Sequence, residues 1–150
     1  MRGRRGWMLA GLLVPVIAAS GAVHHLELVS SGGRVTWRAP IASGEAFDLQ
    51  FVHSHERCLW IQHYRAGRDG AIYQTGSTFP CFGAGMPAGS TDGSPVVRTA
   101  DGYLVAAPAR IGELQMMNSK DAGITVVWRN QRVLISRLFD DFERFTMRVR

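Results

Sequence analysis

The chain of 150 residues contains little lysine, little cysteine and few long apolar runs. Lys120 is its only lysine, so arginine supplies almost all of the positive charge. Beyond residue 22 it has no second apolar stretch of membrane-spanning length, no internal repeat and no sustained helical periodicity. These absences leave a single domain without long helices, large enough to bury roughly two thirds of the surface that its unfolded chain would expose.

The net charge of +5 comes from 17 basic and 12 acidic residues and would suit a nucleic acid or an acidic membrane surface. Three of the arginines lie in residues 1–22, and without them 14 basic residues face 12 acidic ones, a net charge of +2. The remaining arginines are scattered along the chain and form no stripe that would follow a phosphate backbone. We therefore expect no nucleic-acid partner.

Residues 1–22 have the three-part pattern of a secretory signal peptide. The basic stretch MRGRRG precedes the apolar run WMLAGLLVPVIAA, and Ser20-Gly21-Ala22 offers small residues at a possible cleavage site. The apolar run is at the short limit for a spanning helix, so an uncleaved membrane anchor is equally open. Either way, the basic N-terminal side predicts that residues 23–150 lie in the periplasm, or face it from the inner membrane.

Residues 23–150 are expected to form one all-β domain. Apolar side chains alternate with polar ones in five segments: Val35 and Trp37; Phe47, Leu49 and Phe51; Ile124, Val126 and Trp128; Val133 and Ile135; and Phe145, Met147 and Val149. This period of two is typical of antiparallel strands with one buried face. Turn sequences such as Ser31-Gly32-Gly33 and Arg68-Asp69-Gly70 separate the segments. The pattern predicts an antiparallel β-sandwich or a partly closed barrel.

Cys58 and Cys81 are the two cysteines, and both would be exported. In an oxidising compartment an even number of cysteines favours a disulfide. The bond would close a loop with 22 residues between the cysteines. The chain-entropy model gives it a stabilising effect of roughly 3 kcal/mol. Two buried free thiols are the alternative.

The stretch FVHSHERC, residues 51–58, gathers potential metal ligands. His53 is in phase with Phe51 and is expected to point to the core side, and a continued strand would give His55 the same direction. With His63 from the next strand, His53 is a candidate zinc ligand. The alternative is a structural histidine held by hydrogen bonds.

We expect no enzymatic activity. Ser54 is flanked by histidines, but neighbours on a strand point apart, and no G-x-S-x-G sequence is present. A second metal candidate depends on cleavage after Ala22. The new amine of Val23, two amide nitrogens and the imidazole of His25 would then enclose Cu(II) or Ni(II) in a square plane. Otherwise His25 simply leads into a strand.

Three stretches resemble the DUF1850 family of domains of unknown function: His53-Ser54-His55-Glu56, then Tyr64, then FGAGMP at 82–87. The resemblance covers residues 26–149. Members of that family are small exported proteins, often encoded beside TAXI-type TRAP transporters, which take up organic acids across the bacterial inner membrane. The family has valine at the position of His55, which weakens this histidine as a functional ligand.

The resemblance implies an exported, non-catalytic accessory or binding module of a TRAP-type transport system, without a required cofactor. Its partners would be the membrane subunits of the transporter or its solute-binding protein. The implied motif cluster, structural or binding, comprises His53, Ser54, Glu56, Tyr64, Phe82, Gly83, Gly85 and Pro87. Cys58 and Cys81 depart from the family pattern, one in each motif, which suggests a bridge between the motifs. The alternatives are a small periplasmic metal-binding protein using His53 and His63, and a structural envelope domain.

Overall fold

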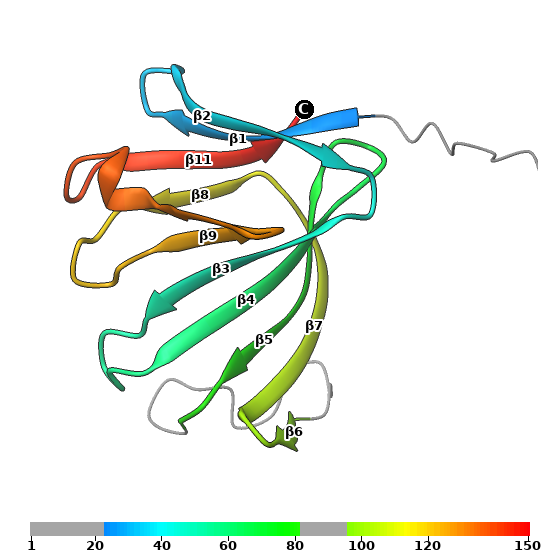
Figure 1. The fold of residues 1–150 in the computed structure, drawn as a ribbon, viewed down its shortest axis with the longest axis vertical. Coiled ribbons are helices and arrows are strands. Elements are labelled where there is room, and N and C mark those ends of the chain that lie inside the picture. The colour runs from blue at the N-terminus through cyan, green and yellow to red at the C-terminus, as the bar shows by residue number, and fades with distance from the viewer. Residues whose placement is uncertain (1–22, 82–95) are drawn as a thin grey trace, which may run out of the picture.

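The computed structural model describes residues 23–81 and 96–150, which form two antiparallel sheets (Figure 1). The strands are β1 (Val23–Ser30), β2 (Val35–Ala42), β3 (Ala46–Val52), β4 (Leu59–Ala66), β5 (Ile72–Phe79), β6 (Val96–Thr99), β7 (Gly102–Gly112), β8 (Leu114–Met117), β9 (Thr125–Trp128), β10 (Gln131–Leu134) and β11 (Arg144–Val149). The small sheet has the order β2-β1-β11-β8, and the large sheet has the order β10-β9-β3-β4-β5-β7-β6. The predicted all-β sandwich is confirmed.

Some predictions concern residues outside this description. They are the signal peptide or anchor at 1–22 and the second motif, with Phe82, Gly83, Gly85 and Pro87. Within residues 23–81 and 96–150, no helix is both long and apolar enough to cross a membrane.

The main core lies between the two sheets. Leu26, Ile41 and Met147 enter it from the small sheet, and Leu49 and Val126 enter it from the large one, all fully buried. In β2, β3, β4 and β11 the buried residues recur at every second position, because alternate side chains of a strand point to the same face. The alternation in the sequence therefore marks the inward faces of the two sheets.

The segment Val133 to Ile135 departs from the expected strand. β10 ends at Leu134, and Ile135 begins a single turn of 3-10 helix, η1 (Ile135–Arg137). The backbone N–H of Ile135 donates to the carbonyl of Ile124 at 2.9 Å, and its side chain is fully buried. The pattern thus predicted the burial of Ile135 correctly and its backbone conformation wrongly.

One end of the large sheet extends beyond the small sheet. Figure 1 shows β4, β5 and β7 fanning out from the sandwich towards the bottom of the view, away from β1 and β2. Phe79 and Val105 are buried there in a second apolar cluster, against which Trp60, Val96 and Tyr103 pack. This end therefore has a small core of its own, separate from the main one.

Candidate functional site

The histidine motif forms the turn between β3 and β4. β3 ends at Val52, and the N–H of His53 donates to the carbonyl of Cys58 at 2.8 Å. Arg57 donates its N–H back to the His53 carbonyl at 2.8 Å and has a φ of 55°, the left-handed conformation that closes the turn. The strand therefore does not continue to His55, and the expectation that His55 shares the inward direction of His53 is wrong.

His53 makes the contacts of a structural histidine. Its ring stacks on Trp60 at 4.8 Å between centroids, and its Nδ1 accepts a hydrogen bond from the backbone N–H of Glu56 at 3.4 Å. The Glu56 carboxylate lies 3.9 Å from Nε2 of the exposed His55, and Ser54 is exposed. Of the first motif, His53 and Glu56 are thus brought together, through a ring nitrogen and a backbone amide.

Four aromatic side chains form a row across the inner face of this end: Phe51, Trp60, Phe79 and Tyr103. Phe51 is the direct partner of Trp60 on β3 and β4, and Phe79 is the direct partner of Tyr103 on β5 and β7. The Trp60 centroid lies 6.0 Å from that of Phe51 and 5.3 Å from that of Phe79, which is 6.0 Å from Tyr103. We call these four residues the aromatic row; His53 stacks at its edge.

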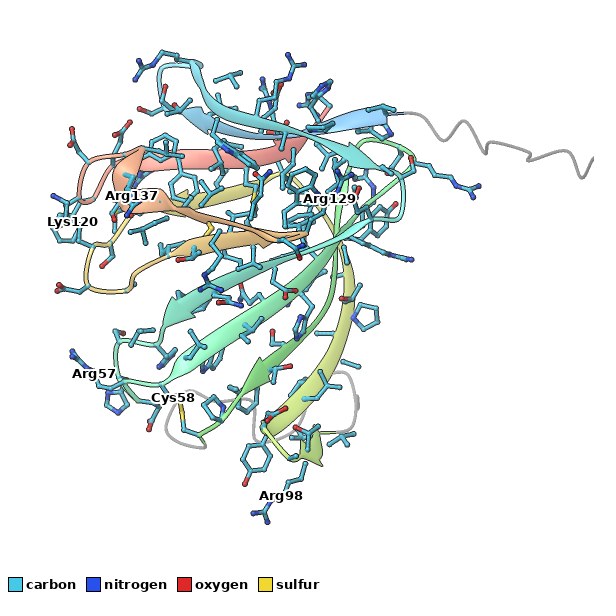
Figure 2. The ribbon with its side chains drawn as sticks, viewed as in Figure 1. Arg57, Cys58, Arg98, Lys120, Arg129 and Arg137 are labelled. Atoms are coloured by element: carbon cyan, nitrogen blue, oxygen red, sulfur yellow. A yellow bond between two sulfur atoms is a disulfide. The ribbon has the colours of Figure 1, made fainter. Side chains whose placement is uncertain are left out.

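A disulfide joins the motif turn to the chain just beyond β5. Cys58 is bonded to Cys81, with 6.4 Å between their Cα atoms (Figure 2). The strand register explains the pairing, since Ile61 faces Thr78 and the cysteines follow three positions further along. The predicted disulfide is therefore present. It fixes the residue immediately before the second motif, 82–87, to the first motif.

The indole of Trp60 carries an unsatisfied donor. Its Nε1 is buried and has no hydrogen-bond partner among the residues that the structure describes. Buried tryptophan N–H groups usually find an acceptor, and an unmade hydrogen bond costs about 1–3 kcal/mol.

Tyr64 lies apart from the other motif residues. It faces Phe47 in the main core, where the two rings stack at 5.5 Å, and it is 2% exposed. Its hydroxyl donates to Gln62 at 2.8 Å, and burial raises its pKa to about 12. It stands six positions from Cys58 along β4, about 20 Å in an extended strand. The structure therefore makes Tyr64 a core residue and separates it from His53.

His63 points to the outer face of the large sheet. Its Nδ1 lies 2.8 Å from Oδ1 of Asp48, and its Nε2 lies 2.7 Å from the hydroxyl of Thr78. Both ring nitrogens thus have protein partners. His63 is also five positions along β4 from Cys58, the neighbour of His53, which is about 16 Å in an extended strand. The predicted zinc pair of His53 and His63 is wrong, because the two side chains are far apart and on opposite faces.

Asp48, His63 and Thr78 form a hydrogen-bonded carboxylate–imidazole–hydroxyl series, the same order of groups as in a catalytic triad. Thr78, however, lies within β5, between Ile61 of β4 and Leu104 of β7. In such a central strand the backbone N–H groups are engaged in the sheet ladder and do not serve as oxyanion donors. We assign these side chains the role of tying three strands together on the outer face.

The remaining metal candidate also has other contacts. His25 lies in β1, where its backbone N–H donates to the carbonyl of Arg150 and its carbonyl accepts from the Arg150 N–H. A square-planar copper site needs that backbone nitrogen as a ligand. Copper binding there would have to break the hydrogen bond from His25 N–H to Arg150, the residue after β11. Among the described residues, no three His, Cys, Asp or Glu side chains are grouped so as to hold a metal ion.

The fold and this site define a two-sheet β-sandwich with a disulfide-fixed aromatic end. The profile of the family described as a domain of unknown function, DUF1850, matches residues 47–135. The chain therefore belongs to the DUF1850 family. No curated protein and no solved structure matches it. The matched segment runs from β3 to the start of η1 and includes the motif turn, both cysteines and the aromatic row.

Sequence reasoning missed the aromatic row. Trp60 follows Cys58 by two residues, and Phe79 precedes Cys81 by two. In an antiparallel pair of strands, if two residues are opposite each other, the residues two positions further along each strand are also opposite each other and lie on the same side of the sheet. The predicted disulfide was therefore sufficient to predict the contact between the two rings.

Proposed function

We propose that this protein is an exported accessory module of a TRAP-type uptake system for organic acids, and that it binds its partner at the aromatic end of the large sheet. The partner is a membrane subunit of the transporter or its solute-binding protein. The module itself has no catalytic role and no cofactor. Its place is the periplasm, or the periplasmic face of the inner membrane.

The observation that carries this proposal is the disulfide that joins the turn of the first motif to Cys81, the residue before the second motif. The first motif, 53–56, forms the turn after β3, and Cys58 of that turn is bonded to Cys81, which directly precedes the second motif in the sequence. The two motifs carry the resemblance to proteins encoded beside TRAP transporters. A covalent link between the chain segments that carry the two motifs is what a shared interaction surface would favour.

Two further features support binding at this end. Aromatic side chains with an available polar atom are enriched in interfaces, because they supply a large apolar area and a directed hydrogen bond. Trp60 has a stacked ring, and its buried Nε1 has no hydrogen-bond partner among the described residues, so a rearrangement on binding could supply one. The disulfide fits an oxidising compartment and holds the turn in place before a partner binds.

The test is co-purification from membranes of cells that produce the transporter, with the full-length tagged protein as bait. Trp60→Phe removes the indole N–H and keeps a ring, and Trp37→Phe makes the same change on β2 of the small sheet. We expect transporter subunits to co-purify with the wild type and with Trp37→Phe, and to be reduced with Trp60→Phe.

If no transporter subunit co-purifies with the wild type, the transport assignment is wrong and the structural envelope domain is favoured. If both variants retain the subunits equally, the transport assignment stands and the aromatic row is not the contact. Circular dichroism of each variant shows whether the fold is kept.

A further inference from the structure

A basic hollow lies at the opposite end of β4 from the aromatic row. It has a volume of about 550 Å³ and is lined by the β2–β3 turn, with Ser43 and Gly44, and by the β4–β5 turn, with Arg65, Arg68, Asp69 and Tyr73. An adjoining hollow of about 360 Å³ shares Arg65 and Tyr73 and adds Arg110 from β7. Both hollows are open to solvent, and they adjoin each other at these two shared side chains.

The floor of this hollow is built by fixed contacts. The Tyr73 hydroxyl donates to Asp69 Oδ2 at 3.1 Å, and Arg110 Nε donates to the same oxygen at 3.0 Å. The backbone of Gly67 lies against both side chains, since a Cβ there would come within 2.4 Å of Asp69 and of the Tyr73 ring. Asp69 is further held by the N–H of Ala71 at 3.2 Å. The floor is therefore ordered before any ligand arrives.

The charges on the hollow do not cancel. Arg110 neutralises Asp69, the one acidic side chain in its lining. Arg65 and Arg68 are exposed, and neither has an acidic partner within 4 Å among residues 23–81 and 96–150. The guanidinium of Arg65 lies over the Tyr73 ring at 5.6 Å, which orients its fork. Two arginines on one rim remain without counter-charge.

We propose that this hollow binds an oxyanion, carboxylate or phosphate, between Arg65 and Arg68 over the Tyr73 ring. Guanidinium groups bind both anions through paired, charge-assisted hydrogen bonds. Two of them on one rim favour a ligand with two negative charges. This site is separate from the partner surface proposed above.

The position of the hollow suggests two sources for the anion. Val23, where the described chain begins, pairs with Ala42, the residue before Ser43 on the rim. Gly70 of the β4–β5 turn lies close to the carbonyl of Val149, at the end of β11. The hollow therefore lies where residues 1–22 join the domain. A phospholipid headgroup would reach it if those residues are anchored, and a dissolved solute would reach it in either case.

The test measures binding of inorganic phosphate, of succinate and of phosphatidylcholine vesicles containing phosphatidylglycerol to the full chain, by calorimetry and vesicle sedimentation. The variant R65Q/R68Q removes both free guanidinium groups. The control R98Q/R137Q removes the same charge at exposed arginines elsewhere, which Figure 2 labels on β6 and η1. We expect R65Q/R68Q to bind at least about tenfold more weakly than the wild type, and R98Q/R137Q to bind like the wild type.

The arms of the test distinguish the sources. Saturable binding of phosphate or succinate supports the site with a dissolved ligand, and binding of phosphatidylglycerol vesicles alone supports it with a lipid headgroup. Equal weakening in both double variants would show that only net charge matters and would overturn the proposal, as would no binding by the wild type. R65K keeps the charge without the fork, and we expect it to be weaker than the wild type. W60F should bind the anion normally, so a failure here is separable from a failure of the transport assignment.

Discussion

Replacing Cys58 and Cys81 with serine is expected to lower the free energy of unfolding by about 3.4 kcal/mol in the chain-entropy model, taking a loop of about 24 residues. The sequence separation of the two cysteines, 23, sets the size of that loop. With an unfolding entropy of about 2.1 cal/mol/K per residue over about 128 residues, this corresponds to a fall in Tm of roughly 12 °C. The serine hydroxyls add little, because both positions are only partly buried.

The loss should be concentrated at one end of the molecule. The small cluster of Phe79 and Val105 has few buried members beside the main core, so the disulfide is a large part of what holds that end. Regions with few buried apolar contacts open locally before the whole domain unfolds. Amides at the start of β4 and the end of β5 should therefore exchange with solvent much faster in the variant. Amides of β1 and β11 should change only as much as the global stability does.

The assay is calorimetry of the oxidised wild type, the reduced wild type and C58S/C81S, followed by hydrogen exchange of the first and third. The reduced wild type and the variant should agree within a few degrees, since both lack the same bond. A fall in Tm below about 3 °C would refute the entropic argument. Uniform acceleration of exchange across both sheets would refute the claim that the aromatic end has a separate core.

Three further predictions concern the body of the sandwich. Glu45 accepts four hydrogen bonds, from Arg129, Trp128 and Ala42, and the Arg129 side chain, the largest influence, lowers its pKa. The ionised Glu45 carboxylate therefore stabilises the fold above the ordinary pKa of glutamate, and this contribution is lost as the pH falls below that value. Glu45→Gln should lower the free energy of unfolding by about 1 kcal/mol at pH 7 and should make the acid denaturation profile flatter. Gly76→Ala places a Cβ 2.6 Å from the Val105 carbonyl oxygen, and urea denaturation should show a loss of stability of about 1–3 kcal/mol. Gly32→Ala, whose Cβ would meet Ser30 Oγ at 3.9 Å, an ordinary contact, should show no such loss. The Tyr64 hydroxyl should titrate near pH 12 when followed by ultraviolet absorbance, and Tyr64→Phe should remove that step. Because folding raises the pKa of Tyr64, the free energy of unfolding should fall as the pH rises above the ordinary tyrosine pKa.

The inward faces of the strands were predictable because they depend on local alternation alone. Phe47 and Leu49 on β3, and Phe145 and Met147 on β11, are buried as their spacing predicts. The order of strands was not predictable, since β1 pairs with β11 across more than a hundred residues of chain. Pairing of this kind depends on the packing of the whole domain and leaves no local pattern.

Two features of the candidate sites needed the strand register. His63 looked like a partner for His53, because both are histidines on adjacent strands. The register instead places His63 opposite Asp48, on the outer face. Arg65 and Arg68 looked like scattered surface charge, and only the turn between β4 and β5 brings them to one hollow with Tyr73. Sequence alone supplied the residue types, and the missing information was which face and which end each one occupies.

The two candidate surfaces lie at opposite ends of β4, which has consequences for how the domain would work. Along β4 (Leu59–Ala66), Trp60 of the aromatic row and Arg65 of the basic hollow are five positions apart, which is about 16 Å. If the hollow meets an anion near the point where residues 1–22 join, the aromatic end points away from that point and towards a partner. Binding at one end therefore leaves the other accessible. We expect R65Q/R68Q and W60F to act independently, each variant losing one interaction and keeping the other. A loss of both interactions in either variant would show that the two ends are coupled through the large sheet.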